Sequence, residues 1–83
     1  MKRIRCAVPF CRRTRRDDGS FTEWICQEHW VLTSARLRRI YSLRKRRIRR
    51  LVSHHDIGRE IRAKRRTWQW LKRQAIERAA GIT

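Results

Sequence analysis

The 83-residue sequence predicts one small, mostly α-helical domain, in which a short cysteine-rich unit over residues 1–30 packs against a helical hairpin over residues 31–83. Three observations predict this fold. All three cysteines and the only proline lie before residue 30. An arginine-rich stretch with helical spacing of its apolar residues then runs almost to the end of the chain. A chain of this length is also marginal for a core that folds by apolar burial alone, which favours additional stabilisation at the cysteines.

Turn-forming residues divide the cysteine-rich unit into short segments. The sequence Asp-Asp-Gly-Ser at residues 17–20 separates residues 12–16 from residues 21–25, and both flanking segments are compatible with β-strands. We therefore expect a short β-hairpin there. Ser20 and Glu23 also have the spacing of a capping box, which would instead begin a helix early, so this boundary stays open.

Two amphipathic helices are predicted by placing the later residues at about 100° per residue. The first helix spans about residues 27–52, and its apolar stripe contains Trp30, Leu37, Ile40, Tyr41, Ile48, Leu51 and Val52. The second spans about residues 57–80, and its stripe contains Ile57, Ile61, Trp68, Leu71, Ala75 and Ala79. Residues 53–56 supply the break, with Asp56 as the N-cap of the second helix.

An antiparallel pairing aligns the two stripes at five levels, which favours a helical hairpin over the alternative of one continuous helix through Gly58. The pairs are Val52 with Ile57, Ile48 with Ile61, Tyr41 with Trp68, Leu37 with Leu71, and Trp30 with Ala79. The same register places Arg44 level with Lys64 in the seam. Either their charged heads extend outward, beside Glu60, or the two cations bind an anion.

The cysteines and one histidine form the pattern Cys-x4-Cys-x14-Cys-x2-His, made of Cys6, Cys11, Cys26 and His29. Three thiolates and one imidazole in two closely spaced pairs are typical of a closed, four-coordinate structural zinc site. The first pair can form a knuckle, and the second pair lies on one face of a helix start. We expect one structural Zn2+, whose binding would contribute about 10 kcal/mol to folding. The alternative is three buried, unligated thiols.

The order of knuckle, hairpin and ligand-bearing helix start is that of a treble-clef finger. The segments Cys-Ala-Val-Pro-Phe-Cys-Arg-Arg-Thr and Glu-Trp-Ile-Cys-Gln-Glu-His-Trp resemble small Cys3His zinc-finger proteins of bacteriophages and prophages, over about residues 6–30. The resemblance implies zinc on the same four residues and a bacterial or phage-infected host cytoplasm. It implies no activity, and the helical two-thirds of the chain lies outside it.

A histidine pair in the turn between the helices raises two further alternatives. His54 and His55 could compete with His29 as the fourth ligand, but they lie at the far end of the hairpin from Cys26. His54-His55-Asp56 could also suggest a nuclease of the His-Asn-His type, yet the chain contains no asparagine. We therefore expect a protein that is not an enzyme.

The charge balance favours a polyanionic partner, because 24 Lys and Arg face 7 Asp and Glu, for a net charge of +17. No acidic residue occurs between residues 29 and 55. Trp70 points away from the apolar stripe and could stack on a base, insert into a partner protein or contact neighbouring arginines. The predicted nucleic-acid contacts are Arg12, Arg13, Arg15 and Arg16 in the cysteine-rich unit, Arg36, Arg38, Arg39, Lys45, Arg46, Arg47, Arg49 and Arg50 in the first helix, and Arg66, Trp70 and Arg73 in the second.

The favoured function is nucleic-acid binding through phosphate contacts, with DNA favoured over RNA. The alternative is a small phage-type adaptor or inhibitor that binds an acidic surface of a host transcription, replication or defence protein, with Trp70 and Leu43 as anchors. The amino-terminal residues lack a signal-peptide core and no apolar run could span a membrane, so we expect a cytoplasmic, nucleoid-associated protein without a membrane partner. The sequence leaves monomer and homodimer open.

Overall fold

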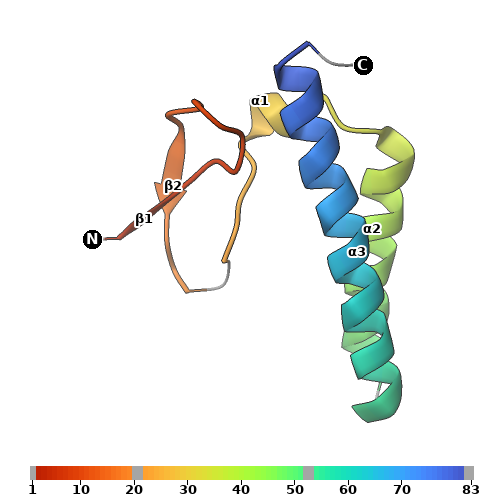
Figure 1. Cartoon of the computed structure of the whole chain (residues 1–83). Helices are drawn as coiled ribbons and strands as arrows, with labels where there is room; N and C mark the ends of the chain where they lie inside the picture. Colours follow the sequence, from red (N-terminus) through yellow and green to blue (C-terminus); the bar gives the residue numbers. More distant parts are fainter. Residues whose placement is uncertain (1, 20–21, 52–53, 82–83) are drawn as a thin grey trace.

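The computed structural model describes residues 2–19, 22–51 and 54–81, apart from the side chain of His54. Within these ranges the elements are β1 (Arg3–Arg5), β2 (Thr14–Arg16), α1 (Gln27–Trp30), α2 (Ala35–Arg50) and α3 (His54–Ala79). The two strands form an antiparallel sheet, and α2 and α3 pack side by side in opposite directions (Figure 1). The prediction of a small, mostly helical protein with an antiparallel helix pair is therefore confirmed. Residues 2–30, which include β1, β2 and α1, are called the finger below.

The strand pairing in the finger differs from the prediction. Strand β2 pairs with β1 and not with the described residues 22–25, so the two strands flank the turn between Cys6 and Cys11. The later segment instead lies beside Cys6: the backbone N–H of Ala7 donates to the carbonyl of Trp24 at 2.7 Å. This placement brings the two cysteine pairs together, and it leaves the treble-clef order unconfirmed. Glu23 lies outside any helix, so the capping-box alternative is wrong, while Ser20 lies outside the described residues.

The single helix predicted over about residues 27–52 is wrong, because α1 ends at Trp30 and α2 begins at Ala35. Side chains in the break hydrogen-bond to the backbone and so compete with helical pairing. The hydroxyl of Thr33 donates to the carbonyl of Trp30 at 2.7 Å, and the hydroxyl of Ser34 caps α2 by accepting from the N–H of Leu37 at 3.4 Å. Two residue types that favour helix caps thus end one helix and begin the next.

The second long helix begins earlier than predicted. Helix α3 starts at His54, so Asp56 lies in its first turn and is not the N-cap. Negative charge in the first turn still interacts favourably with the helix dipole. At the other end, the N–H of Gly81 donates to the carbonyl of Arg78 at 3.1 Å with the glycine at φ 81°, a left-handed conformation that commonly ends helices.

Aromatic rings define the seam between the helices. Tyr41 of α2 and Trp68 of α3 have ring centroids 5.8 Å apart, which confirms that level of the predicted register. Trp30 stacks on Trp68 at 6.1 Å, whereas its predicted partner Ala79 is exposed, because the chain turns away after α1. The predicted level of Val52 with Ile57 cannot be compared, because Val52 lies outside the described residues.

Arg44 is paired with an acid in the seam, whereas Lys64 on the same level makes no ion pair within the described part of the chain. Nη1 of Arg44 lies 3.2 Å from Oε2 of Glu60, whose other oxygen lies 3.6 Å from Nε of Arg47. The charged head of Arg44 therefore reaches an acid on α3 across the seam, while its Nε is buried without a hydrogen-bond partner among the described residues. Glu60 pairs with Arg44 and Arg47 and not with Lys64, so the first interpretation of this level does not hold as stated. An anion is not needed to balance Arg44.

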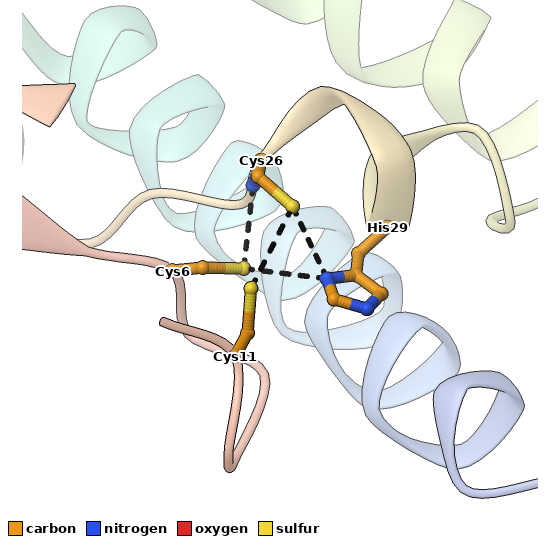
Figure 2. Close-up of side chains that lie close together, drawn as sticks. All are labelled: Cys6, Cys11, Cys26 and His29. Atoms are coloured by element: carbon orange, nitrogen blue, oxygen red, sulfur yellow. Dashed lines mark hydrogen bonds between the residues drawn. The ribbon is translucent and has the colours of Figure 1, made fainter. Parts of the chain in front are cut away.

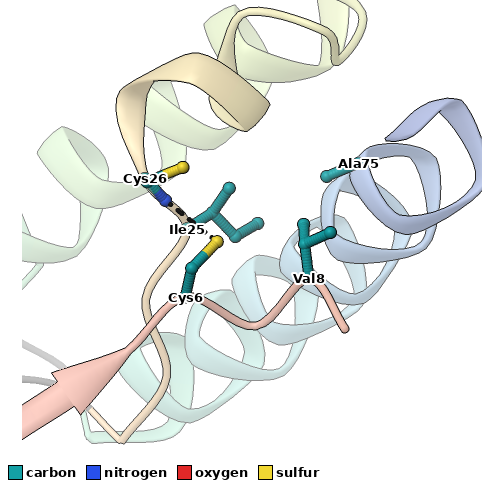
Figure 3. Close-up of a cluster of buried hydrophobic side chains, with 5 residues drawn as sticks. All are labelled: Cys6, Val8, Ile25, Cys26 and Ala75. Carbon is teal, nitrogen blue, oxygen red and sulfur yellow. Dashed lines mark hydrogen bonds between the residues drawn. The ribbon is translucent and has the colours of Figure 1, made fainter. Parts of the chain in front are cut away.

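The finger docks on α3 through a small core and one carboxylate. Cys6, Val8 and Ile25 of the finger are buried together with Ala75 of α3 (Figure 3). Beside this core, Glu23 accepts hydrogen bonds from Nε1 of Trp68 at 3.1 Å and from Nζ of Lys72 at 2.6 Å. These two bonds, chiefly the one from Lys72, lower the pKa of Glu23 against the opposing effect of burial.

We predict that Glu23→Gln lowers the free energy of unfolding by about 1 kcal/mol, because a charge-assisted hydrogen bond to α3 is weakened. Since folding lowers the pKa of Glu23, its contribution is present above the ordinary value of 4.5 and is lost as the pH falls through the lowered value. Urea unfolding of the two proteins measures the difference. Glu28→Gln is the matched control, because its pair with Arg13 is exposed and should contribute almost nothing. Equal effects of the two substitutions would contradict the assignment.

Candidate metal centre

The four predicted ligands converge on one point of the finger (Figure 2). Their ligand atoms all lie within 4.8 Å of one another: the Sγ atoms of Cys6, Cys11 and Cys26 and one ring nitrogen of His29. The Sγ atoms of Cys11 and Cys26 are 3.9 Å apart, and Nδ1 of His29 is 3.1 Å from Sγ of Cys26 and 3.7 Å from Sγ of Cys6. Tetrahedral zinc has bonds of about 2.3 Å to sulfur and about 2.1 Å to nitrogen, so two sulfur ligands would lie about 3.8 Å apart and a sulfur and a nitrogen ligand about 3.6 Å apart. The cluster could therefore hold a metal ion.

Local backbone hydrogen bonds position each ligand pair. In the first pair, the N–H of Cys6 donates to the carbonyl of Arg13 at 3.0 Å, and the N–H of Cys11 donates to that of Val8 at 3.2 Å. In the second pair, Cys26 is the N-cap of α1, and the N–H of His29 donates to the carbonyl of Cys26 at 3.1 Å. Each pair is therefore held by its own turn, and only the contact between the turns has to be made over a long range.

The three cysteines are thiols, and their surroundings shift the pKa values of two of them in opposite directions. All three are free, and the 3.9 Å between the Sγ atoms of Cys11 and Cys26 far exceeds a disulfide bond of about 2.05 Å. Burial raises the pKa of Cys6, whereas a hydrogen bond from the backbone of Arg13 lowers the pKa of Cys11. The N–H of Cys26 also donates to Sγ of Cys6 at 3.3 Å. A metal ion would deprotonate such thiols and neutralise the resulting charge.

The turn of the first ligand pair contains a strained residue. Phe10 has φ 68°, in the left-handed region that side chains other than glycine rarely adopt, and its side chain is 99% exposed. It follows Pro9 in the turn closed by Val8 and Cys11, at the position where a type II turn requires positive φ. The finger thus keeps a strained phenylalanine that packs on nothing in the described chain.

Phe10→Gly is expected to stabilise the protein by about 1 kcal/mol, because the left-handed conformation costs glycine nothing and no packing is lost. Thermal unfolding of the metal-loaded protein measures the change. Phe10→Ala is the matched control: it removes the same ring but keeps the backbone strain, so its stability should stay close to that of the parent. A destabilised Phe10→Gly protein would show that the ring packs on the fold.

The structure uses several of the predicted nucleic-acid contacts within the fold. Arg13 pairs with Glu28, Arg47 with Glu60 and Arg73 with Glu77. Nη1 of Arg38 donates to the carbonyls of Trp30 at 3.1 Å and Thr33 at 2.6 Å, so this arginine supports the break between α1 and α2. The remaining predicted residues with exposed side chains are Arg12, Arg16, Arg36, Arg39, Lys45, Arg46, Arg49, Arg50, Arg66 and Trp70; Arg15 is half-buried.

Sequence reasoning missed the pairing of Glu23 with Trp68 and Lys72, residues 45 and 49 positions away. No local pattern indicates it, although Lys72 lies one turn from Trp68 on α3. The histidines considered as competing ligands do not join the described cluster: His55 is exposed, and the side chain of His54 lies outside the described part.

No protein-family model, curated protein or solved structure matches this chain. The resemblance to phage Cys3His fingers therefore stays a prediction. Among the described residues, no helix combines the length and the apolar character needed to cross a membrane.

We predict that His29→Ala lowers the affinity for Zn2+ more than about 100-fold, because the loss of a ligand should exceed the 10–100-fold effect of removing a group that only hydrogen-bonds to a ligand. His29→Cys should retain tight binding through four thiolates. Competition with a chromophoric chelator measures both affinities. His55→Ala, which removes an exposed imidazole from α3, serves as the control and should leave the affinity unchanged. Equal affinities of the parent and His29→Ala would remove His29 from the site.

Proposed function

We propose that this chain is a zinc-stabilised protein that binds nucleic acid, DNA in the first instance, through phosphate contacts of α2 and without catalysis. The observation that carries the proposal is the density of exposed positive charge on α2. In this proposal the zinc site stabilises the fold, and the cations of α2 bind the nucleic acid.

The donor set favours zinc over other metals. Three soft thiolates with one imidazole suit Zn2+ in a tetrahedral site, whereas oxygen ligands would favour magnesium or calcium. Because four protein ligands complete the coordination, no position is left for water or substrate. The metal is therefore structural in this proposal.

Helix α2 carries nine basic residues among sixteen and no acid. Three of the nine are engaged in the described fold: Arg38 with backbone carbonyls, and Arg44 and Arg47 with Glu60. Six exposed cations remain in the described part of the helix, namely Arg36, Arg39, Lys45, Arg46, Arg49 and Arg50. They lie along a rod of about 24 Å, and a chain of repeating phosphates would neutralise them while releasing counterions.

A protein partner is the second candidate function, favoured by two exposed apolar side chains. Leu43 of α2 and Trp70 of α3 are each 58% exposed. Large apolar side chains on a charged surface are typical anchors of protein interfaces. In that case the cations of α2 would steer association with an acidic surface, and Trp70→Ala would be the severe substitution.

We expect DNA binding that weakens steeply with salt, and the double variant Arg46→Gln/Arg50→Gln should reduce the slope of log affinity against log salt by about 2, one for each lost phosphate contact. Fluorescence anisotropy of a labelled duplex at several salt concentrations measures the slope. The double variant Arg59→Gln/Arg62→Gln removes the same charge from exposed positions of α3 and should leave the slope nearly unchanged. A flat salt dependence of the parent protein would contradict the proposal and favour a protein partner.

A further inference from the structure

A cleft of about 670 Å³ lies between the finger and the helix pair. One side is formed by residues of the finger, including Trp24 and Trp30, and the other by α2 and α3, including Tyr41 and Trp68. We propose that this cleft binds one unpaired nucleotide of a nucleic acid, with the base on the aromatic rings and its phosphates on the cations of the rim. The inference rests on the proposed function and adds a substrate preference to it.

The aromatic side chains of the cleft are ordered but incompletely covered. All four are half-buried in the described structure. The indole of Trp68 is fixed by its hydrogen bond to Glu23 at 3.1 Å, and Trp30 lies against it with 30° between the ring planes. Such preorganised rings are the surfaces on which unpaired bases stack, and a base inside a regular duplex cannot reach them because its neighbours cover both faces.

The charges around the cleft favour an anion. Lys45 of α2 and Lys64 and Arg65 of α3 line it. Lys45 lies over the ring of Tyr41 at 5.5 Å from its centroid, while Lys64 and Arg65 make no ion pair within the described part of the chain. The acid among the described lining residues, Glu23, is neutralised by Lys72 at 2.6 Å.

Size and composition point to one nucleotide. The volume lies within the range of about 300–1,000 Å³ that is typical of sites for small ligands. Aromatic walls with a cationic rim match a flat base linked to phosphate, and they do not match an acidic peptide without aromatic groups. In this proposal Lys64 binds the phosphate of the nucleotide, which gives a role to a lysine that has no acidic partner among the described residues of the seam.

The test compares two labelled duplexes that differ by one unpaired thymidine in a bulge, at one salt concentration. The parent protein should bind the bulged duplex about tenfold more tightly, as expected for one stacked base. The double variant Lys64→Gln/Arg65→Gln should lose this preference while keeping its affinity for the regular duplex. The variant Arg59→Gln/Arg62→Gln, with the same change of charge on α3 outside the cleft, should keep the preference.

An independent readout is the set of four indole N–H signals in the NMR spectrum of the parent protein, assigned with Trp70→Phe. The bulged duplex should shift the signals of Trp24, Trp30 and Trp68 more than the regular duplex does. The signal of Trp70 should have the same position with either duplex. Equal affinity for the two duplexes, with the steep salt dependence expected for phosphate contacts, would overturn the proposal that the cleft binds a nucleotide and would leave the proposed function intact. If neither duplex binds, both proposals fail; if instead only an acidic peptide shifts these signals, the cleft is a protein-binding site.

Discussion

The convergence of four ligand atoms within 4.8 Å is the constraint on which the rest of the structure depends. In its described residues the finger has two strands of three residues and one helix of four, too little regular structure to persist alone. Two of its buried side chains, Cys6 and Cys26, belong to the cluster that could hold the metal ion. Without a metal, burial raises the pKa of Cys6 and so disfavours its thiolate form. A bound ion would stabilise the buried thiolate, and the free energy of metal binding would then contribute to folding.

Closing the finger has consequences beyond the site. It presents Val8 and Ile25 to Ala75 of α3, and it brings Glu23 to Trp68 and Lys72. These contacts set the distance between the finger and the helix pair, so they also shape the aromatic cleft. The α2 helix, in contrast, is held by its seam with α3 and keeps most of its cations exposed. The structure thus separates a stabilising centre from a charged surface.

The sequence predicted the features that depend on local spacing. The ligand set could be read from its pattern because each pair lies in one turn, and the level of Tyr41 with Trp68 followed from the helical period. The break after Trp30 was missed because it depends on side-chain hydrogen bonds of Thr33 and on Arg38 reaching back to two carbonyls. Strand pairing and the Glu23 contacts depend on how the turns meet in space, which no periodicity records.

The most direct test of the metal-centred account is native mass spectrometry of the purified protein combined with circular dichroism before and after chelation. We expect a mass excess of one zinc ion per chain, and loss of the near-ultraviolet signal of the tryptophans when the ion is removed. A metal-free chain with an unchanged spectrum, unaffected by chelator, would contradict the account.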